Sequence, residues 1–184
     1  MKRKDYLLTA LVPLGLLLVP ITGQLTVEGW HWKWHGFLFA WAVFTFATWF
    51  VRFLVTRPAA NLPYKVGVTL AIVTGFLVTW CDLAVQIIGE DNPGNVLYLL
   101  TVLGGFIGVA ISRFRPGGLS IVAFAMAASF LLIPAVAVLN WPADFDPGYP
   151  KIQALSAVVA ALFTASGLLI RRATAQPAPA ALVT

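Results

Sequence analysis

The sequence predicts an all-α fold: a polytopic membrane helix bundle of about six transmembrane helices, with both the N- and C-termini cytoplasmic. Of the 184 residues, 60% are hydrophobic and 10% are charged, and the mean hydropathy is +0.88. Soluble domains carry about 45–50% apolar and about 25% charged residues, and a soluble fold of this length has too small an interior for the excess. We therefore expect an integral membrane protein.

Six apolar stretches are long enough to cross a hydrocarbon core of ~30 Å as helices. They cover residues 6–23, 36–56, 65–89, 95–112, 119–140 and 152–170. The first follows a basic segment and is similar to a signal peptide, but Ile21-Thr22-Gly23 is a poor cleavage site, so we keep it as a span. We expect residues 1–172 to form a single transmembrane domain, and residues 173–184 to form a mobile cytoplasmic tail.

The distribution of basic residues predicts the orientation, because Lys and Arg gather on the cytoplasmic side of multi-pass proteins. With the N-terminus inside, ten of the twelve Lys and Arg residues fall on the inner side, and only Lys33 and Lys151 fall outside. The net charge of +5 follows this topological pattern instead of forming one basic surface. We therefore expect no nucleic-acid partner.

Asp82 is the one acidic residue expected inside a span. Gly75, Thr79, Asp82 and Gln86 follow one another at steps of four, three and four, so they share one helical face. That face must point into the bundle, because a charged side chain facing lipid costs about 2.5–3.5 kcal/mol on insertion scales. Two interpretations stay open: Asp82 couples a proton or cation to transport, or it is a buried polar contact of Thr79, Gln86 or a neighbouring helix. We favour the second.

A second group of polar residues lies at the outer turn between the third and fourth spans. Glu90, Asp91, Asn92 and Asn95 form a candidate outer acidic rim. The spacing of a calcium loop is absent. We instead expect Gly89 to end one helix and Asn92 to cap the next, with the acids stabilising its positive N-terminus.

The remaining metal-ligating residue types predict no metal site and no cofactor. His31 and His35 lie four residues apart in an aromatic segment typical of the membrane boundary, and a haem pair would need histidines on facing helices. The single cysteine, Cys81, excludes a cysteine cluster and is expected to be buried and inert. No catalytic motif is present in the sequence, so we do not expect an enzyme.

Small residues at four-residue spacing predict close helix packing, since association in lipid depends on packing and polar contacts. These rows are Gly67, Ala71, Gly75 and Thr79 in the third span, Gly104 and Gly108 in the fourth, Ala123 and Ala127 in the fifth, and Ala157, Ala161 and Ala165 in the sixth. We expect them to pack inside the bundle. A homo-oligomer or a membrane-complex partner docked on such a face is the alternative.

The run from Asp82 to Asn95, followed by Arg113-Phe114-Arg115-Pro116, resembles a family of small bacterial multi-pass inner-membrane proteins. That family carries a run close to N-L-A-V-x-I-I-G-x-E-D-N-P-x-N and then A-R-F-R-P. The resemblance implies a bacterial inner (cytoplasmic) membrane location, and no activity is assigned to the family. Its members carry Asn where this chain has Asp82, which implies a buried hydrogen-bonding role and not an obligatory proton carrier.

The function expected from the sequence is that of a non-catalytic integral membrane protein with an accessory, assembly or structural role and the lipid bilayer as its main partner. The alternative is a small proton- or cation-coupled permease that uses Asp82, with the acidic rim concentrating cations. Replacing Asp82 by Asn separates the two, because only the permease would lose its activity.

Overall fold

The computed structural model describes residues 3–26, 33–56, 61–89, 91–142 and 148–175, with side chains from Leu11 onward except at residues 84–85. All long elements in this part of the chain are helices: α1 (Arg3–Thr26), α2 (Trp34–Val55), α3 (Leu62–Val85), α4 (Val96–Ile111), α5 (Pro116–Asn140) and α6 (Tyr149–Ala175). A short 3-10 helix, η1 (Pro93–Asn95), precedes α4. The five helices α2 to α6 are long and apolar enough to cross a membrane, counting η1 with α4. The predicted polytopic helical bundle is therefore confirmed.

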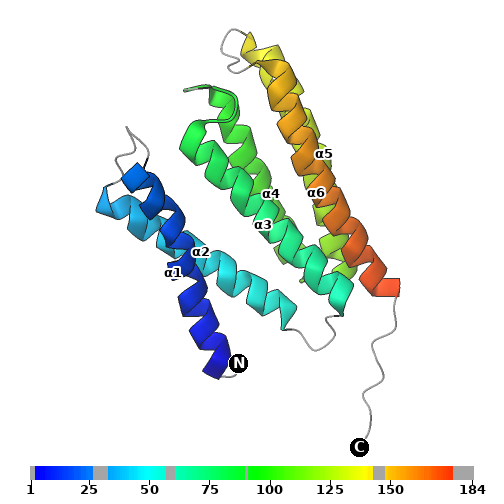
Figure 1. The fold of residues 1–184 in the computed structure, drawn as a ribbon. Helices are drawn as coiled ribbons and strands as arrows, with labels where there is room; N and C mark the ends of the chain where they lie inside the picture. The colour runs from blue at the N-terminus through cyan, green and yellow to red at the C-terminus, as the bar shows by residue number, and fades with distance from the viewer. Residues whose placement is uncertain (1–2, 27–32, 57–60, 90, 143–147, 176–184) are drawn as a thin grey trace, which may run out of the picture. The chain divides into compact units, whose positions relative to one another are not determined.

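The helices form two compact units, Met1–Thr56 and Arg57–Thr184, which are described separately. The prediction of one domain over residues 1–172 stays a prediction. In the first unit, α1 packs on α2 (Figure 1). The aromatic residues of α2 stack along the helix at i, i+4, with ring centroids 5.9 Å apart for Phe46 and Phe50 and 5.6 Å apart for Trp49 and Phe53.

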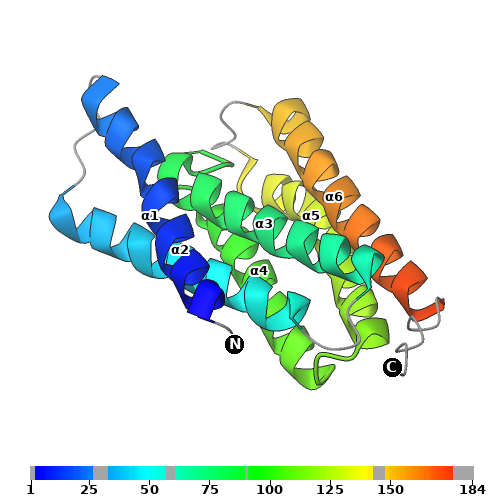
Figure 2. The same ribbon diagram turned by 60° about the horizontal axis from the view of Figure 1, so that its bottom comes forward.

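The second unit is a bundle of α3, α4, α5 and α6. In this unit α6 packs against both α3 and α5, and α4 packs on α5 (Figures 1 and 2). Because consecutive helices run in opposite directions, the basic residues near the start of α3, between α4 and α5 and at the end of α6 gather at one end of this unit. They are Lys65, Arg113, Arg115, Arg171 and Arg172. This arrangement is the one that the predicted topology requires of this part of the chain.

Aromatic residues fill the centre of the second unit. The rings of Phe130 and Phe163 stack with their centroids 5.4 Å apart, and Tyr98 lies 6.0 Å from Phe130. All three side chains are at most 1% exposed. They join α4, α5 and α6 into one apolar core.

Glycine and serine bring the helices of this unit into close contact. The Ser166 hydroxyl donates to the Gly67 carbonyl oxygen over 2.8 Å, and the Ser120 hydroxyl donates to the Gly167 carbonyl oxygen over 2.9 Å. A Cβ atom added at Gly67 would lie 2.8 Å from Cγ1 of Ile170. These contacts are the small-residue packing and interhelical bonding that stabilise helices in lipid.

The small-residue rows were predicted correctly on α3 and α5, in part on α4, where Gly108 packs on Val122 but Gly104 is exposed, and wrongly on α6. Ala123 and Ala127 on α5 are buried, whereas Ala157 and Ala161 on α6 are exposed. The buried face of α6 begins one residue earlier, at Ser156 and Ala160. The row of alanines does not predict the contact face of α6. The adjacent face of the same helix carries the large residues that fill the core, and it also carries the small residues at the helix contacts.

The turn between α4 and α5 holds two residues in a strained backbone conformation. Arg113 (φ 51°) and Phe114 (φ 58°) are both left-handed, a region that residues with a Cβ atom adopt at a cost. The turn is closed by the Phe114 N–H, which donates to the Val109 carbonyl 3.3 Å away, and α5 starts directly afterwards at Pro116. The Arg-Phe-Arg-Pro run therefore makes a tight connection.

We expect Gly67→Ala to destabilise the protein by about 1–3 kcal/mol, because the new methyl group must push α3 away from α6. Gly104→Ala is the matched control, since none of the described atoms would lie within 4 Å of its Cβ. The measurement is thermal unfolding of the full chain in detergent, followed by tryptophan fluorescence. Equal unfolding temperatures for the two variants would contradict the α3–α6 contact.

We expect Arg113→Gly to be more stable than Arg115→Gly by about 1 kcal/mol. Both changes remove an exposed positive charge and add a glycine, but only Arg113 has a positive φ, whereas Arg115 is extended at φ −73°. The unfolding temperatures of the two variants give the comparison directly. An Arg113→Gly variant no more stable than Arg115→Gly would show that the turn stores no strain.

Candidate functional site

The helix that carries Asp82 ends earlier than predicted. α3 stops at Val85, four residues before Gly89, because Gln86 adopts a left-handed conformation with φ 50°. The Gln86 N–H donates to the Asp82 carbonyl oxygen over 2.9 Å and caps the helix. Asp82 therefore lies in the last turn of α3, whereas a span over residues 65–89 would have placed it seven residues, or about two turns, before the helix end.

The three residues predicted to form the intramembrane polar site are not bonded to one another. Thr79 shares the face of Asp82, but its hydroxyl donates to the Gly75 carbonyl oxygen over 2.9 Å. Gln86 has left the helical face, and its Oε1 accepts from the Asp91 N–H. Asp82 must therefore find its neighbours on other helices.

Asp82 lies on the buried face of the last turn of α3. Its side chain is 6% exposed, and its Oδ1 atom has no hydrogen-bond partner among the described residues. The backbone N–H of Ile87, just past the helix end, donates to the carboxylate. The hydroxyl of Tyr98 of α4 lies 3.0 Å from the Ser156 hydroxyl of α6, and the charge of Asp82 acts on Tyr98. We name Asp82, Tyr98 and Ser156 the polar cluster.

The packing of α3 against α6 supports this placement. Gly67 lies against Ser166 and Ile170, and Gly75 lies opposite Phe163, so the two helices run antiparallel with a constant register. Continued to residue 82, these contacts bring Asp82 level with the first two turns of α6. Sequence analysis missed both Tyr98 and Ser156, although a tyrosine in an apolar span signals a buried hydroxyl that needs a partner.

The outer turn is held by asparagine side chains. Oδ1 of Asn95 accepts from the Ile88 N–H over 2.9 Å, and its Nδ2 donates to the Gly89 carbonyl oxygen over 2.8 Å. Asn92, which is 4% exposed, caps η1 by accepting from the Gly94 N–H over 2.7 Å. This internal bonding lets Ile88 be fully buried in the core.

The predicted acidic rim is therefore not one surface. Asn92 and Asn95 bond to the backbone of the turn, and only Asp91 of the described members is exposed. Glu90 lies outside the described residues. The capping role expected of Asn92 is confirmed, whereas the role of Asn95 as a bridge between Ile88 and Gly89 was not foreseen.

The other candidate residues contribute no cluster in the described part of the chain. His35 is exposed near the start of α2, and His31 lies outside the described residues. No group of three or more His, Cys, Asp or Glu side chains comes together among the residues searched. Cys81 is exposed, contrary to expectation, because its neighbour Asp82 occupies the buried face of the helix.

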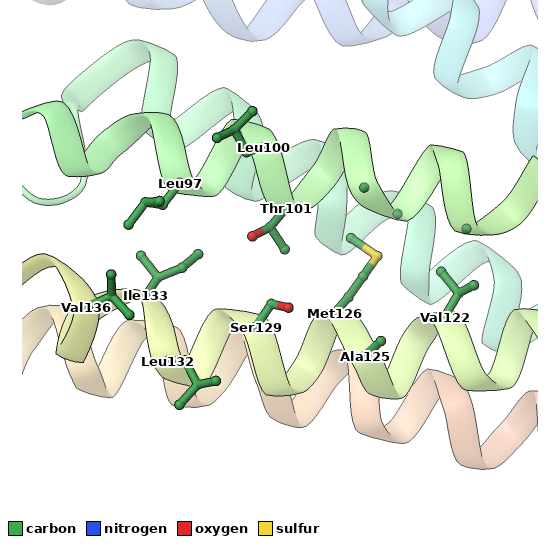
Figure 3. A pocket seen from close by; sticks show the side chains of 13 residues that line it. Leu97, Leu100, Thr101, Val122, Ala125, Met126, Ser129, Leu132, Ile133 and Val136 are labelled. Carbon is green, nitrogen blue, oxygen red and sulfur yellow. The ribbon is translucent and has the colours of Figure 1, made fainter.

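A groove of about 480 Å³ lies between α4 and α5, away from Asp82 (Figure 3). Three glycines of α4 form its floor: Gly104, Gly105 and Gly108. Its α5 wall is mainly apolar, with Met126 and Ile133 on it, and the oxygens of Thr101 and Ser129 point into it (Figure 3). Asp82 does not line this groove.

No protein-family model, no curated protein and no solved structure matches this chain. The functional argument therefore rests on the geometry of the polar cluster and of the outer turn.

We expect Asn95→Ala to destabilise the protein by about 1–3 kcal/mol, because it leaves the Ile88 N–H and the Gly89 carbonyl without their partners. Asn140→Ala is the control: its side chain is exposed and donates only to the Val136 carbonyl of its own helix. Thermal unfolding in detergent measures both changes. If Asn95→Ala lowered the unfolding temperature no more than Asn140→Ala does, the bridging role of Asn95 would be contradicted.

Proposed function

We propose that this multi-pass membrane protein is non-catalytic and serves an accessory, assembly or structural role, with Asp82 fixing how three helices pack. The observation that carries the proposal is the position of Asp82, 6% exposed on the buried face of the last turn of α3. A transport carboxylate must exchange its proton or ion with water on each side in turn. The groove between α4 and α5 is lined without Asp82.

The internal bonding of the second unit supports a packing role. Each serine bond between helices joins two elements at one defined depth, and such bonds contribute about 0.6–2 kcal/mol in membranes. The bond between Tyr98 and Ser156 is one of them. A polar group whose hydrogen bond forms in only one arrangement of the helices favours that arrangement. Arrangements in which one helix has shifted along its neighbour lose the bond.

Family and location belong to the same proposal. We infer that the chain is a member of the bacterial inner-membrane family that its Asp82–Asn95 run resembles, with both termini in the cytoplasm. The support is the gathering of Lys and Arg at one end of the second unit, which is the cytoplasmic end under the positive-inside rule.

A small proton- or cation-coupled permease is the second candidate function. The observation that favours it is the unpaired Oδ1 atom of Asp82. A buried polar atom without a partner is rare in folded proteins and often marks function.

We expect Asp82→Asn to fold, to unfold within a few degrees of the wild-type chain, and to leave cellular function intact. The reason is that Asn has nearly the same shape and keeps a polar group at the helix junction. The measurements are thermal unfolding and complementation of a deletion strain, with Asp91→Asn as the exposed control. Proteoliposomes carrying a pH or Na⁺ gradient test the alternative: solute flux that Asp82→Asn abolishes and Asp91→Asn retains would overturn the packing role.

A further inference from the structure

The turn between α4 and α5 carries two arginines whose charge no described residue of the second unit balances. Arg113 and Arg115 are exposed, and neither forms an ion pair with a described side chain. The described carboxyl groups of this unit, Asp82 and Asp91, lie at its opposite end. Long basic side chains at the ends of membrane helices extend to the level of the lipid headgroups. Lipid phosphates are therefore the nearest source of negative charge to this turn.

This turn is joined directly to the end of the groove between α4 and α5. Gly108 is the last residue of α4 that lines the groove. The Ser112 N–H donates to the Gly108 carbonyl over 2.9 Å, and the Arg115 N–H donates to the Ser112 carbonyl over 3.0 Å. Two backbone hydrogen bonds thus connect Arg115 with the residue at the end of the groove. The charged turn and the apolar groove are therefore neighbours.

The groove has dimensions that suit a hydrocarbon chain. Its lining on α4 runs from Leu97 to Gly108, which is about 16 Å of helix at 1.5 Å per residue. The acyl chains of one leaflet cover a similar length, half of a ~30 Å hydrocarbon core. A whole helix with its side chains is about 10–12 Å across, so a groove of about 480 Å³ admits only single side chains of a neighbouring helix. A hydrocarbon chain is thin enough to lie along it.

The glycines of α4 determine where the groove is closed and where it is open. A Cβ atom added at Gly105 would lie 2.6 Å from Sδ of Met126, and one added at Gly108 would lie 2.9 Å from Cγ2 of Val122. These two glycines therefore bring α4 against α5. A Cβ atom added at Gly104 would meet none of the described atoms within 4 Å. Gly104 thus leaves room for a guest between helices that are otherwise in close contact.

The two hydroxyl groups in the groove do not prevent an apolar guest. The oxygens of Thr101 and Ser129 point into the groove (Figure 3). A serine or threonine hydroxyl in a helix can also rotate and donate to the carbonyl four residues earlier. The hydroxyls of Thr79 and Thr164 in the same unit do so, over 2.9 Å and 2.8 Å. By the same rotation, Thr101 and Ser129 keep a hydrogen bond when a hydrocarbon chain lies beside them.

We propose that the α4–α5 groove and the arginines of the adjoining turn form a binding site for one anionic phospholipid, with an acyl chain in the groove and the phosphate beside Arg113 and Arg115. The guanidinium group suits this role, because it binds phosphate oxygens through paired N–H donors. Two unbalanced positive charges favour a headgroup with a net negative charge over a zwitterionic one. This inference goes beyond the packing role of Asp82 and holds equally for an accessory protein and for a permease.

The test is native mass spectrometry of the full chain in detergent, titrated with dioleoyl phosphatidylglycerol or with dioleoyl phosphatidylcholine. We expect the wild-type chain to retain one phosphatidylglycerol in preference to phosphatidylcholine. Replacing both arginines of the turn, by Arg113→Gln with Arg115→Gln, should lower the affinity for phosphatidylglycerol roughly tenfold. The matched control is Arg171→Gln with Arg172→Gln. It removes the same charge at the same end of the unit, but from α6, which does not line the groove, so the affinity should stay that of the wild type.

Gly104→Leu tests the groove separately from the charge. The new side chain starts in open space and fills the groove, and leucine forms helices more readily than glycine, so the chain should fold. We expect it to lose most of its phosphatidylglycerol binding with both arginines of the turn intact. If this variant does not fold, Ala125→Leu fills the groove from its α5 side. Glycerol 3-phosphate, which has a phosphate and no acyl chain, should not displace the lipid at equal concentration.

Equal retention of phosphatidylglycerol and phosphatidylcholine by the wild-type chain would overturn the proposal. An equal loss of affinity in the two double variants would also overturn it, because the charge of the whole end would then act without a specific site. Wild-type affinity in Gly104→Leu, or displacement by glycerol 3-phosphate, would place the acyl chain outside the groove. A wild-type dimer that Gly104→Leu dissociates would make the groove an interface between two copies of the chain, again contrary to the proposal.

Discussion

A bilayer interior offers no water to polar groups, so every backbone group exposed by the end of a membrane helix must find a partner within the protein. The left-handed residue Gln86 ends α3 while the chain is still apolar, and this exposes the backbone of the following turn. Asn92 and Asn95 satisfy part of that backbone with their own amide groups. Because amide side chains both donate and accept, two of them close the turn without needing charge. These hydrogen bonds of the turn determine how deeply the Ile88 side chain is buried in the core.

The same early end of α3 determines what Asp82 becomes. In a longer helix its carboxylate would lie among intrahelical bonds and against one neighbouring helix. In the last turn it lies at the negative end of the dipole and beside the Ile87 N–H, which is free of the helix. The environment of Asp82 therefore depends on the backbone geometry, on the packing and on the electrostatics of the helix end. The polar cluster is where the unit departs from simple apolar packing.

Much of the fold could be predicted from the sequence, because the length of an apolar stretch and the position of basic residues are strong signals in membranes. The end of α3 could not, since Ile87 and Ile88 continue the apolar stretch past Gln86 and only tertiary packing reveals the left-handed turn. Asp82 was identified by its charge alone. Tyr98 and Ser156, which bond to each other, were not identified, because they lie 58 positions apart in the chain and no spacing rule joins them. The exposed alanines of α6 show the same limit: composition indicates a close-packing face, but the neighbouring helix decides which face is used.

The difference between a carboxylate and an amide at position 82 follows from hydrogen-bond chemistry. An ionised carboxylate only accepts, and the last carbonyls of α3 are further acceptors, whereas the Ile87 N–H is a donor beside the carboxylate. An amide brings two N–H donors and no charge, and it can bond to helix carbonyls and hydroxyl oxygens by itself. An asparagine can therefore satisfy such acceptors without a charge, whereas an aspartate carries a donor only in its protonated form. A chain with the acid at this position therefore links the packing of the end of α3 to the protonation of one buried carboxyl group.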